Sequence, residues 1–137
     1  MPAPPKRPKR GVSMDKSTWN AVVRLAAAQR MTVSEAFTAV FAAYGTGSLP
    51  HPPAPETVYT ERGSGTGRGR YTIDVPGPTW TAAATRAGMA VDPGTGRITM
   101  GASARYRSMS NLAEALGQAL VAGTVTLAGA TAVPADT

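Results

Sequence analysis

The stretch Lys9-Arg10-Gly11-Val12-Ser13-Met14-Asp15 carries the clearest structural pattern in the sequence. Its apolar residues, Val12 and Met14, alternate with small ones, which is the period-two pattern of a short strand with one buried face. Asp15 ends the stretch and is a good N-cap for a helix. The sequence therefore predicts a strand that leads directly into a helix.

Two helices are expected after this strand. The first is marked by an apolar stripe at helical spacing and reaches about Gln29. The second is predicted to have Ser34 as its N-cap, with Glu35 in the first turn, where the helix dipole favours an acid, and Gly45 as its C′ residue. The two stripes are Trp19, Val22, Val23 and Ala26, and then Phe37, Val40, Phe41 and Tyr44.

A second block repeats the order of the first. Aligning Trp19 with Trp80 gives an offset of 61 (80 − 19) and brings the strand 12–14 onto 73–75. A third helix is expected with Pro78 at position N1, where the missing N–H costs nothing. The inward residues of this strand and helix are predicted to be Tyr71, Ile73, Val75, Trp80, Ala83, Ala84 and Ala87.

The last helix of the second block begins at Ser110, the predicted N-cap, and its apolar stripe is Leu112, Leu116 and Leu120. Matching Ser34 to Ser110 gives an offset of 76 (110 − 34), which exceeds 61, so the second copy contains an insertion at about 91–107. A short strand is expected at 97–100 within it.

The segments outside the two blocks have the composition of arms and linkers. Residues 1–8 are predicted to form a disordered basic arm, 46–69 a flexible linker rich in proline and glycine, and 124–137 a tail. Residues 57–60 have the composition of a short strand inside that linker. The domain organisation is therefore arm 1–8, first unit 9–45, linker 46–69, second unit 70–123 and tail 124–137.

The composition is basic and excludes several kinds of chemistry. The 137 residues include 14 Lys+Arg and 8 Asp+Glu, which gives a net charge of +6. The chain contains no cysteine, and its one histidine, His51, lies in a proline-rich stretch, so disulfides, thiolate metal sites and a Ser-His-Asp triad are not expected. We expect no enzyme activity, no cofactor, no metal, no small-molecule substrate and no membrane partner.

The basic residues gather in three places, at 6–10, 62–70 and 97–107. Charges of this kind can simply keep a surface soluble, but three clusters with few acids between them favour contact with a polyanion such as nucleic acid. Motifs for catalysis are poor by comparison. Ser13-Met14-Asp15-Lys16 fits S-x-x-K without its companion motifs, and the glycine run 63–69 lacks the pattern of a nucleotide-binding loop.

The first block resembles a ribbon-helix-helix DNA-binding domain. The resemblance covers about residues 9–45 and rests on the strand that ends in Asp15, on both helix lengths, and on Val33-Ser34-Glu35 at the start of the second helix. It implies a mainly α fold with a two-stranded antiparallel ribbon, in which two units pair. Because residues 70–123 resemble the same unit more weakly, one chain is expected to supply both as a single-chain pseudo-dimer; pairing between two chains would instead give a homodimer.

The ribbon of such a fold fits the major groove of B-DNA, so its outward residues are the candidate base contacts. Arg70 is the best of these, because a guanidinium pairs bidentately with guanine O6 and N7. Asp74 could accept from cytosine N4 or could instead orient Arg70. The full set predicted to contact bases is Lys9, Gly11, Ser13, Arg70, Thr72 and Asp74.

Candidate phosphate contacts follow from the basic arm and from the N-termini of the second helix of each unit, which offer free N–H groups and a positive dipole end. In the resembled family this turn holds the DNA backbone. The predicted set is Lys6, Arg7, Arg10, Thr32, Val33, Ser34, Arg68, Ser108, Met109 and Ser110.

These observations predict a sequence-specific protein that binds double-stranded DNA and acts as a small transcriptional repressor or autoregulator. The alternatives are a plasmid-partition (centromere-binding) or relaxosome accessory protein, and the antitoxin of a toxin–antitoxin pair. The expected partners are double-stranded DNA and, on repeated sites, further copies of the chain in cooperative arrays. The expected location is the cytoplasm, in association with the nucleoid or a plasmid.

Overall fold

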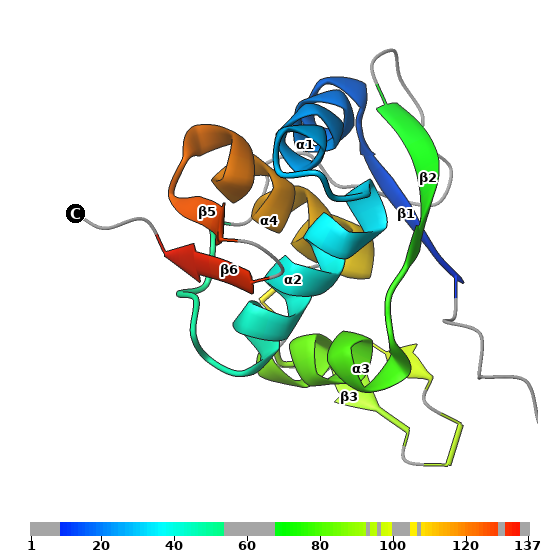
Figure 1. Cartoon of the computed structure of the whole chain (residues 1–137). Coiled ribbons are helices and arrows are strands. Elements are labelled where there is room, and N and C mark those ends of the chain that lie inside the picture. The colour runs from blue at the N-terminus through cyan, green and yellow to red at the C-terminus, as the bar shows by residue number, and fades with distance from the viewer. Residues whose placement is uncertain are drawn as a thin grey trace, which may run out of the picture.

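A computed structural model describes residues 9–53, 68–92, 94–95, 97–99, 105–106, 108–128 and 131–134, and it does not describe the side chains of Lys9, Arg68 and Ala128. Within these residues the fold is mixed, with four helices and three two-stranded antiparallel pairs (Figure 1). In chain order the elements are β1 (Lys9–Asp15), α1 (Lys16–Ala28), α2 (Val33–Gly45), β2 (Arg68–Asp74), α3 (Gly77–Arg86), β3 (Ala90–Val91), β4 (Ile98–Thr99), α4 (Met109–Ala122), β5 (Val125–Ala128) and β6 (Thr131–Pro134).

The strands β1 and β2 pair antiparallel, so the expected two-stranded ribbon is confirmed. It lies along one side of the helices, opposite the β5–β6 hairpin (Figure 1). The offset of 61 also relates the two strands in their pairing. Lys9 is opposite Asp74, and the residues equivalent to these two, Arg70 and Ser13, are opposite each other as well. The central pair is Gly11 and Thr72, which the same shift exchanges with each other.

The inner face of the ribbon covers a core built largely by α2 and α4. The aliphatic side chains that alternate along both strands are buried, as predicted, and so are the stripes of α2 and α4, whereas Tyr71 is only half-buried. Each such side chain contributes roughly 1.5–3 kcal/mol when it leaves water. The buried residues that carry this core are Val12, Met14, Ile73, Val75, Phe37, Val40, Phe41, Tyr44, Leu112, Leu116 and Leu120.

Helix α1 turns a slightly different face inward than its apolar stripe predicts. It buries Thr18, Val22 and Ala26, whereas Val23, which was expected inside, is 38% exposed. The reason is its crossing with α4 at Gly117, where an added Cβ would lie 2.9 Å from Thr18 Cγ2. This close approach places the Thr18 row against α4 and leaves Val23 on the outside.

The two tryptophans, which the sequence aligns, are covered in corresponding ways. Trp19 stacks on Tyr71 of β2 with ring centroids 4.1 Å apart, and Trp80 lies 5.3 Å below the guanidinium of Arg10 of β1. Arg10 and Tyr71 are themselves related by the same offset of 61 (71 − 10). Each tryptophan is thus covered by the strand of the other unit, in one case by an aromatic ring and in the other by a cation.

The N-caps of α2 and α4 differ from the predicted ones. Thr32 rather than Ser34 caps α2, because Thr32 and Glu35 form a capping box with 2.9 and 3.1 Å hydrogen bonds. Ser108 rather than Ser110 caps α4 by accepting the N–H of Asn111. Ser34 and Ser110 therefore lie inside the first turns of their helices, where their hydroxyls are available for other partners.

Two other helix ends also differ slightly from the predicted ones. Gly45 is the last residue of α2, and the left-handed backbone expected there occurs at Gly47, with φ of +86°. Helix α3 begins at Gly77, so Pro78 occupies its second position. Gly45 has a packing reason instead, because a Cβ there would lie 3.1 Å from Cβ of Ala82 in α3.

The start of the predicted linker is packed. Leu49 and Pro52 are buried, the Tyr44 hydroxyl lies 2.8 Å from His51 Nδ1, and the Tyr106 hydroxyl donates to the Pro52 carbonyl. This order was not expected from the proline-rich composition. The arm 1–8 and the short strand predicted at 57–60 lie outside the described residues.

The predicted tail contains the β5–β6 hairpin, which packs against α2 and α4 and buries Val125 and Ala132. Alternating Val125 and Leu127 carry a strand signal that is too short to stand out from a tail. None of the helices within the described ranges is long and apolar enough to cross a membrane.

Candidate nucleic-acid interface

The outer face of the ribbon is open at its centre. Gly11 of β1 and Thr72 and Arg70 of β2 are exposed, as predicted for residues that alternate with a buried face. Four of the predicted base contacts, Gly11, Ser13, Arg70 and Thr72, therefore lie together on one face around the central pair. Lys9 is opposite Asp74 at one end of this face.

The Arg70 side chain crosses the ribbon. Arg70 is opposite Ser13 in the register, yet its Nη2 lies 3.0 Å from the place that a Cβ on Gly11 would occupy. Within the described part of the chain this guanidinium forms no hydrogen bond and no ion pair. The donors of Arg70 thus lie over the middle of the ribbon and bond to no other group of the described residues.

Ser13 was predicted to face the groove, but it is only 2% exposed. Its position in the register is on the outer face, beside Arg70. The N-terminus of α4 closes over the strand edge at this residue, because the Ser13 N–H donates to Ser110 Oγ at 2.9 Å. The prediction that Ser13 is open to a base is therefore wrong for this structure.

Asp74 is half-buried, and its carboxylate Oδ1 is buried without a hydrogen-bond partner. Its backbone is anchored on both sides, because the N–H donates to Ser34 Oγ at 3.0 Å and the carbonyl accepts from Thr38 Oγ1 at 3.2 Å. The side chains of Asp74 and Arg70 form no hydrogen bond with each other, so the alternative in which Asp74 orients Arg70 has no support in this structure.

The two helix N-termini lie at opposite outer edges of the ribbon. Ser110 of α4 accepts the N–H of Ser13 in β1, and Ser34 of α2 accepts the N–H of Asp74 in β2. The numbers of the two serines differ by 76 and those of the two strand residues by 61, which are the two offsets of the sequence repeat. These bonds satisfy edge N–H groups that would otherwise be open and fix both predicted phosphate turns, 32–34 and 108–110, beside the ribbon.

The two turns differ in charge. The first turn of α2 contains Glu35, whereas the first turn of α4 contains no acid. A carboxylate near the positive end of a helix competes with an incoming phosphate for the same dipole and N–H groups. Ser108, Met109 and Ser110, all half-buried, therefore offer the better anion site.

Arg10 was predicted to contact phosphate, but it lies on the inner side of the ribbon. Its register partner is the buried Ile73, its guanidinium covers Trp80, and its Nε is buried without a hydrogen-bond partner. Successive residues of a strand face opposite sides, so Arg10 faces inward because its neighbour Gly11 is on the outer face. Lys6 and Arg7 lie outside the described residues, and so do the side chains of Lys9 and Arg68.

A buried carboxylate, which the sequence pattern did not single out, holds the junction of β1 and α1. Glu114 of α4 is fully buried and accepts the Asp15 N–H at 2.9 Å and the Thr18 hydroxyl at 2.7 Å. Gln118 Nε2 also donates to it, at 2.8 Å. Burial raises the pKa of Glu114 although these hydrogen bonds oppose the rise.

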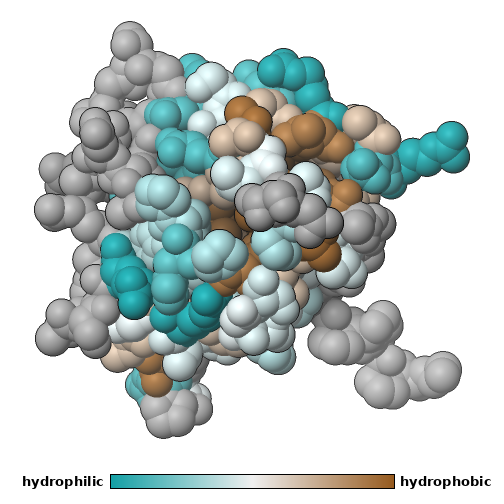
Figure 2. All heavy atoms as spheres, turned by 90° about the vertical axis from the view of Figure 1, so that its left-hand side faces the viewer, coloured by the Kyte–Doolittle hydropathy of each residue, from teal (hydrophilic) through white to brown (hydrophobic). Residues whose placement is uncertain are grey.

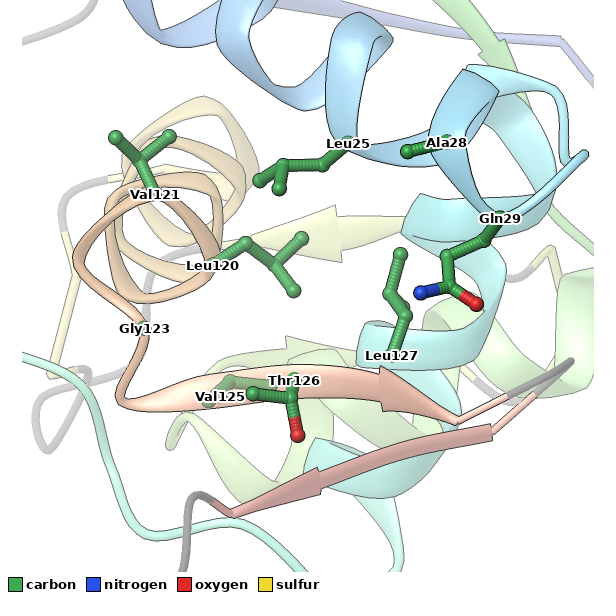
Figure 3. A pocket seen from close by; sticks show the side chains of 9 residues that line it. All are labelled: Leu25, Ala28, Gln29, Leu120, Val121, Gly123, Val125, Thr126 and Leu127. Carbon is green, nitrogen blue, oxygen red and sulfur yellow. The ribbon is translucent and has the colours of Figure 1, made fainter.

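An apolar pocket of about 310 Å³ lies between the C-terminal ends of α1 and α4 and the strand β5. Leu25, Leu120 and Leu127 point into it (Figure 3). Seen from the side away from the ribbon, hydrophobic residues reach the surface (Figure 2). Two residues that line the pocket, Leu25 and Val121, are themselves exposed. The described residues that line the pocket include no charged side chain.

Comparisons of the chain with protein-family models, with curated proteins and with solved structures give no match.

Proposed function

We propose that this protein binds double-stranded DNA by inserting the β1–β2 ribbon into the major groove. One observation carries the proposal: the Arg70 guanidinium has no protein partner among the described residues and lies over the centre of an exposed two-stranded ribbon. The major groove admits a ribbon of two strands, and guanine presents O6 and N7 there to a bidentate donor. The net charge of +6 favours the same partner.

The architecture that we propose is a ribbon-helix-helix fold made by one chain as a pseudo-dimer. Three correspondences support it: the register that an offset of 61 reproduces, the serine bonds to both ribbon edges, and the covered tryptophans. In each case a residue of the first unit contacts the second unit, and the equivalent residue of the second unit contacts the first. This is the pattern that pairing of two like units produces.

Contacts to phosphate would come from the turns that flank the ribbon. The positive ends of α2 and α4 are fixed beside the two strands, at a distance set by the Ser34 and Ser110 hydrogen bonds. Phosphate contacts of this kind position a protein on the duplex, whereas the ribbon side chains specify the sequence. The basic residues of 1–8 add charge that is independent of sequence.

In biological terms we propose a small transcriptional repressor or autoregulator that acts in the cytoplasm on nucleoid or plasmid DNA. A plasmid-partition protein, a relaxosome accessory protein or an antitoxin would use the same ribbon. A partition protein would cover tandem repeats cooperatively, whereas an autoregulator would occupy one short operator. Footprinting on DNA taken from beside the gene separates these roles.

The binding mode is tested with duplexes enriched from a random pool by the full chain. Fluorescence anisotropy at about 0.15 M salt should give an affinity at least a thousandfold above that for an unrelated duplex, as for specific binders. Methylating guanine N7, a major-groove atom, should abolish this preference, whereas a minor-groove ligand on the same duplex should leave it in place. If no duplex is preferred over any other, the proposed function is wrong.

A further inference from the structure

The two strands of the ribbon occupy equivalent positions but present different side chains. The offset of 61 pairs Lys9 with Arg70, Gly11 with Thr72, and Ser13 with Asp74. In a dimer of two identical chains, such equivalent positions would necessarily be identical, and the surface would match a palindrome. Here one chain supplies both strands, so nothing in the pairing enforces two equal halves.

One end of the ribbon face is formed by Ser13 and Arg70. Ser13 is covered, so Arg70 is the described side chain that this end offers to a base, and its guanidinium extends from there toward the central pair. Beyond it Asp15 is opposite Arg68 in the register. The turn beside this end is that of α4, which has no acid.

The other end of the face is formed by Lys9 and Asp74. Asp74 is half-buried, and its Oδ1 is covered by the protein, so this end offers a base no arginine fork like that of Arg70. The turn beside this end is that of α2, which is joined to Asp74 through Ser34 and contains Glu35. The two ends therefore differ in their flanking turns, because the turn at this end contains Glu35 and the turn at the Arg70 end contains no acid.

From this polarity we infer that the protein reads a site without two-fold symmetry, and reads it in one orientation. The inference rests on the proposed function. The half-site under Arg70 contains a guanine and is bound tightly through the α4 turn. The half-site under Asp74 is not its inverted copy, because no arginine faces it from the equivalent position, and its backbone is bound less tightly.

The first test is the sequence that the wild-type chain enriches from randomised duplexes. The expected motif is non-palindromic, and replacing its guanine should weaken binding roughly 5- to 150-fold, the range for one bidentate contact. An inverted repeat as the preferred motif would overturn the inference while leaving DNA binding intact. Enrichment of no motif would instead remove the proposed function, and the inference with it.

The second test makes the two strands alike. The triple variant Lys9→Arg, Thr72→Gly, Asp74→Ser gives both strands arginine, glycine and serine at the equivalent positions, and it keeps the Asp74 backbone bond to Ser34. This variant should enrich an inverted repeat of the Arg70 half-site, with circular dichroism to establish that it folds. If the folded variant enriches the same non-palindromic motif as wild type, the outer side chains do not set the asymmetry and the inference fails.

Orientation on the DNA is measured with a chain whose ribbon residues are unchanged. This measurement therefore does not depend on whether the triple variant folds. The chain has no cysteine, so Ser17→Cys provides a single attachment point for an iron chelate. Ser17 is exposed and follows the end of β1 that holds Ser13. Hydroxyl-radical cleavage is expected on one side of the motif centre only, beside the guanine half. Equal cleavage on both sides would contradict a single orientation.

Discussion

The guanidinium of Arg70 lies over Gly11 of the facing strand, 3.0 Å from the point where a Cβ would be. The absence of a side chain at Gly11 creates the space that this guanidinium occupies. The pair therefore leaves room for a hydrogen-bonding fork at the centre of the ribbon.

Replacing Arg70 by alanine should remove discrimination for one base while leaving the fold intact. The loss expected is about 1–3 kcal/mol for the cognate duplex, with non-specific binding nearly unchanged. Arg70→Lys should recover charge but not the bidentate contact. Anisotropy titrations of cognate and scrambled duplexes give both numbers.

Arg24→Ala is the matched control for this change. Arg24 is an exposed arginine of α1 beside the apolar side of the molecule, away from the ribbon. The same charge is lost, so any general electrostatic effect appears in both variants. Equal losses for Arg24→Ala and Arg70→Ala would show that Arg70 contributes only charge.

Gly11→Ala should weaken specific binding without destabilising the protein. The added methyl group meets the far end of a flexible side chain, which can move by a few tenths of an ångström. The melting temperature should be unchanged or slightly higher, because alanine restricts the unfolded chain. Cognate affinity should fall and non-specific affinity should not, since Arg70 is displaced but remains charged. A variant that melts much lower would show that Gly11 has a backbone role instead.

Ser110→Ala and Ser34→Ala should each destabilise the fold by similar amounts. Each change removes the acceptor of a strand-edge N–H, of Ser13 or of Asp74. An amide left without a partner costs about 1–3 kcal/mol, and partial exposure places these at the lower end. Urea unfolding measures the change, with the exposed Ser17→Ala as control. If only one of the two variants is destabilised, the edges are not held in equivalent ways.

Glu114 gives the stability a defined dependence on pH. Because burial raises its pKa in the folded state above the ordinary value of 4.5, the folded protein retains the proton when the unfolded chain has lost it. The contribution is therefore most favourable below pH 4.5 and declines as the pH rises through the folded pKa. The free energy of unfolding of wild type minus that of Glu114→Gln should fall over this interval. A difference that rises with pH would reverse the sign of the pKa shift.

The mass of the free protein should be that of one chain, 14.0 kDa. β1 and β2 already pair with each other, and each tryptophan is covered by a residue of the same chain. A second chain is therefore not needed to close the ribbon. Light scattering coupled to gel filtration gives the mass directly. A mass of twice this value that survives dilution would favour pairing between chains.

The ribbon and its partners were predictable because their signals are local and repeated. The alternation in 9–15, the Thr-Trp pair at an offset of 61 and the helical stripes each mark an element by spacing alone. The predicted capping at Ser34 and Ser110 was wrong, although Thr32 and Glu35 carry the capping-box spacing. In both helices a competing cap residue lies two positions earlier.

The remaining differences depend on partners distant in sequence. The burial of Ser13 is caused by α4, and no residue near Ser13 in the sequence indicates its contact with Ser110. In the sequence Arg10 belongs to the basic cluster 6–10, and its inward position becomes evident only from its contact with Trp80. Glu114 reads as an ordinary helix acid, and only the packing of α1 against α4 makes it an acceptor for Asp15 and Thr18.

Binding of DNA by the ribbon is best measured by following backbone amide resonances as a cognate duplex is added to the labelled full chain. We expect the largest changes along 9–15 and 68–74 and in the first turns of α2 and α4, with little change at the apolar pocket between α1, α4 and β5. Changes concentrated around Leu25, Val121 and Leu127, with the ribbon amides unaffected, would show that the ribbon does not bind the duplex.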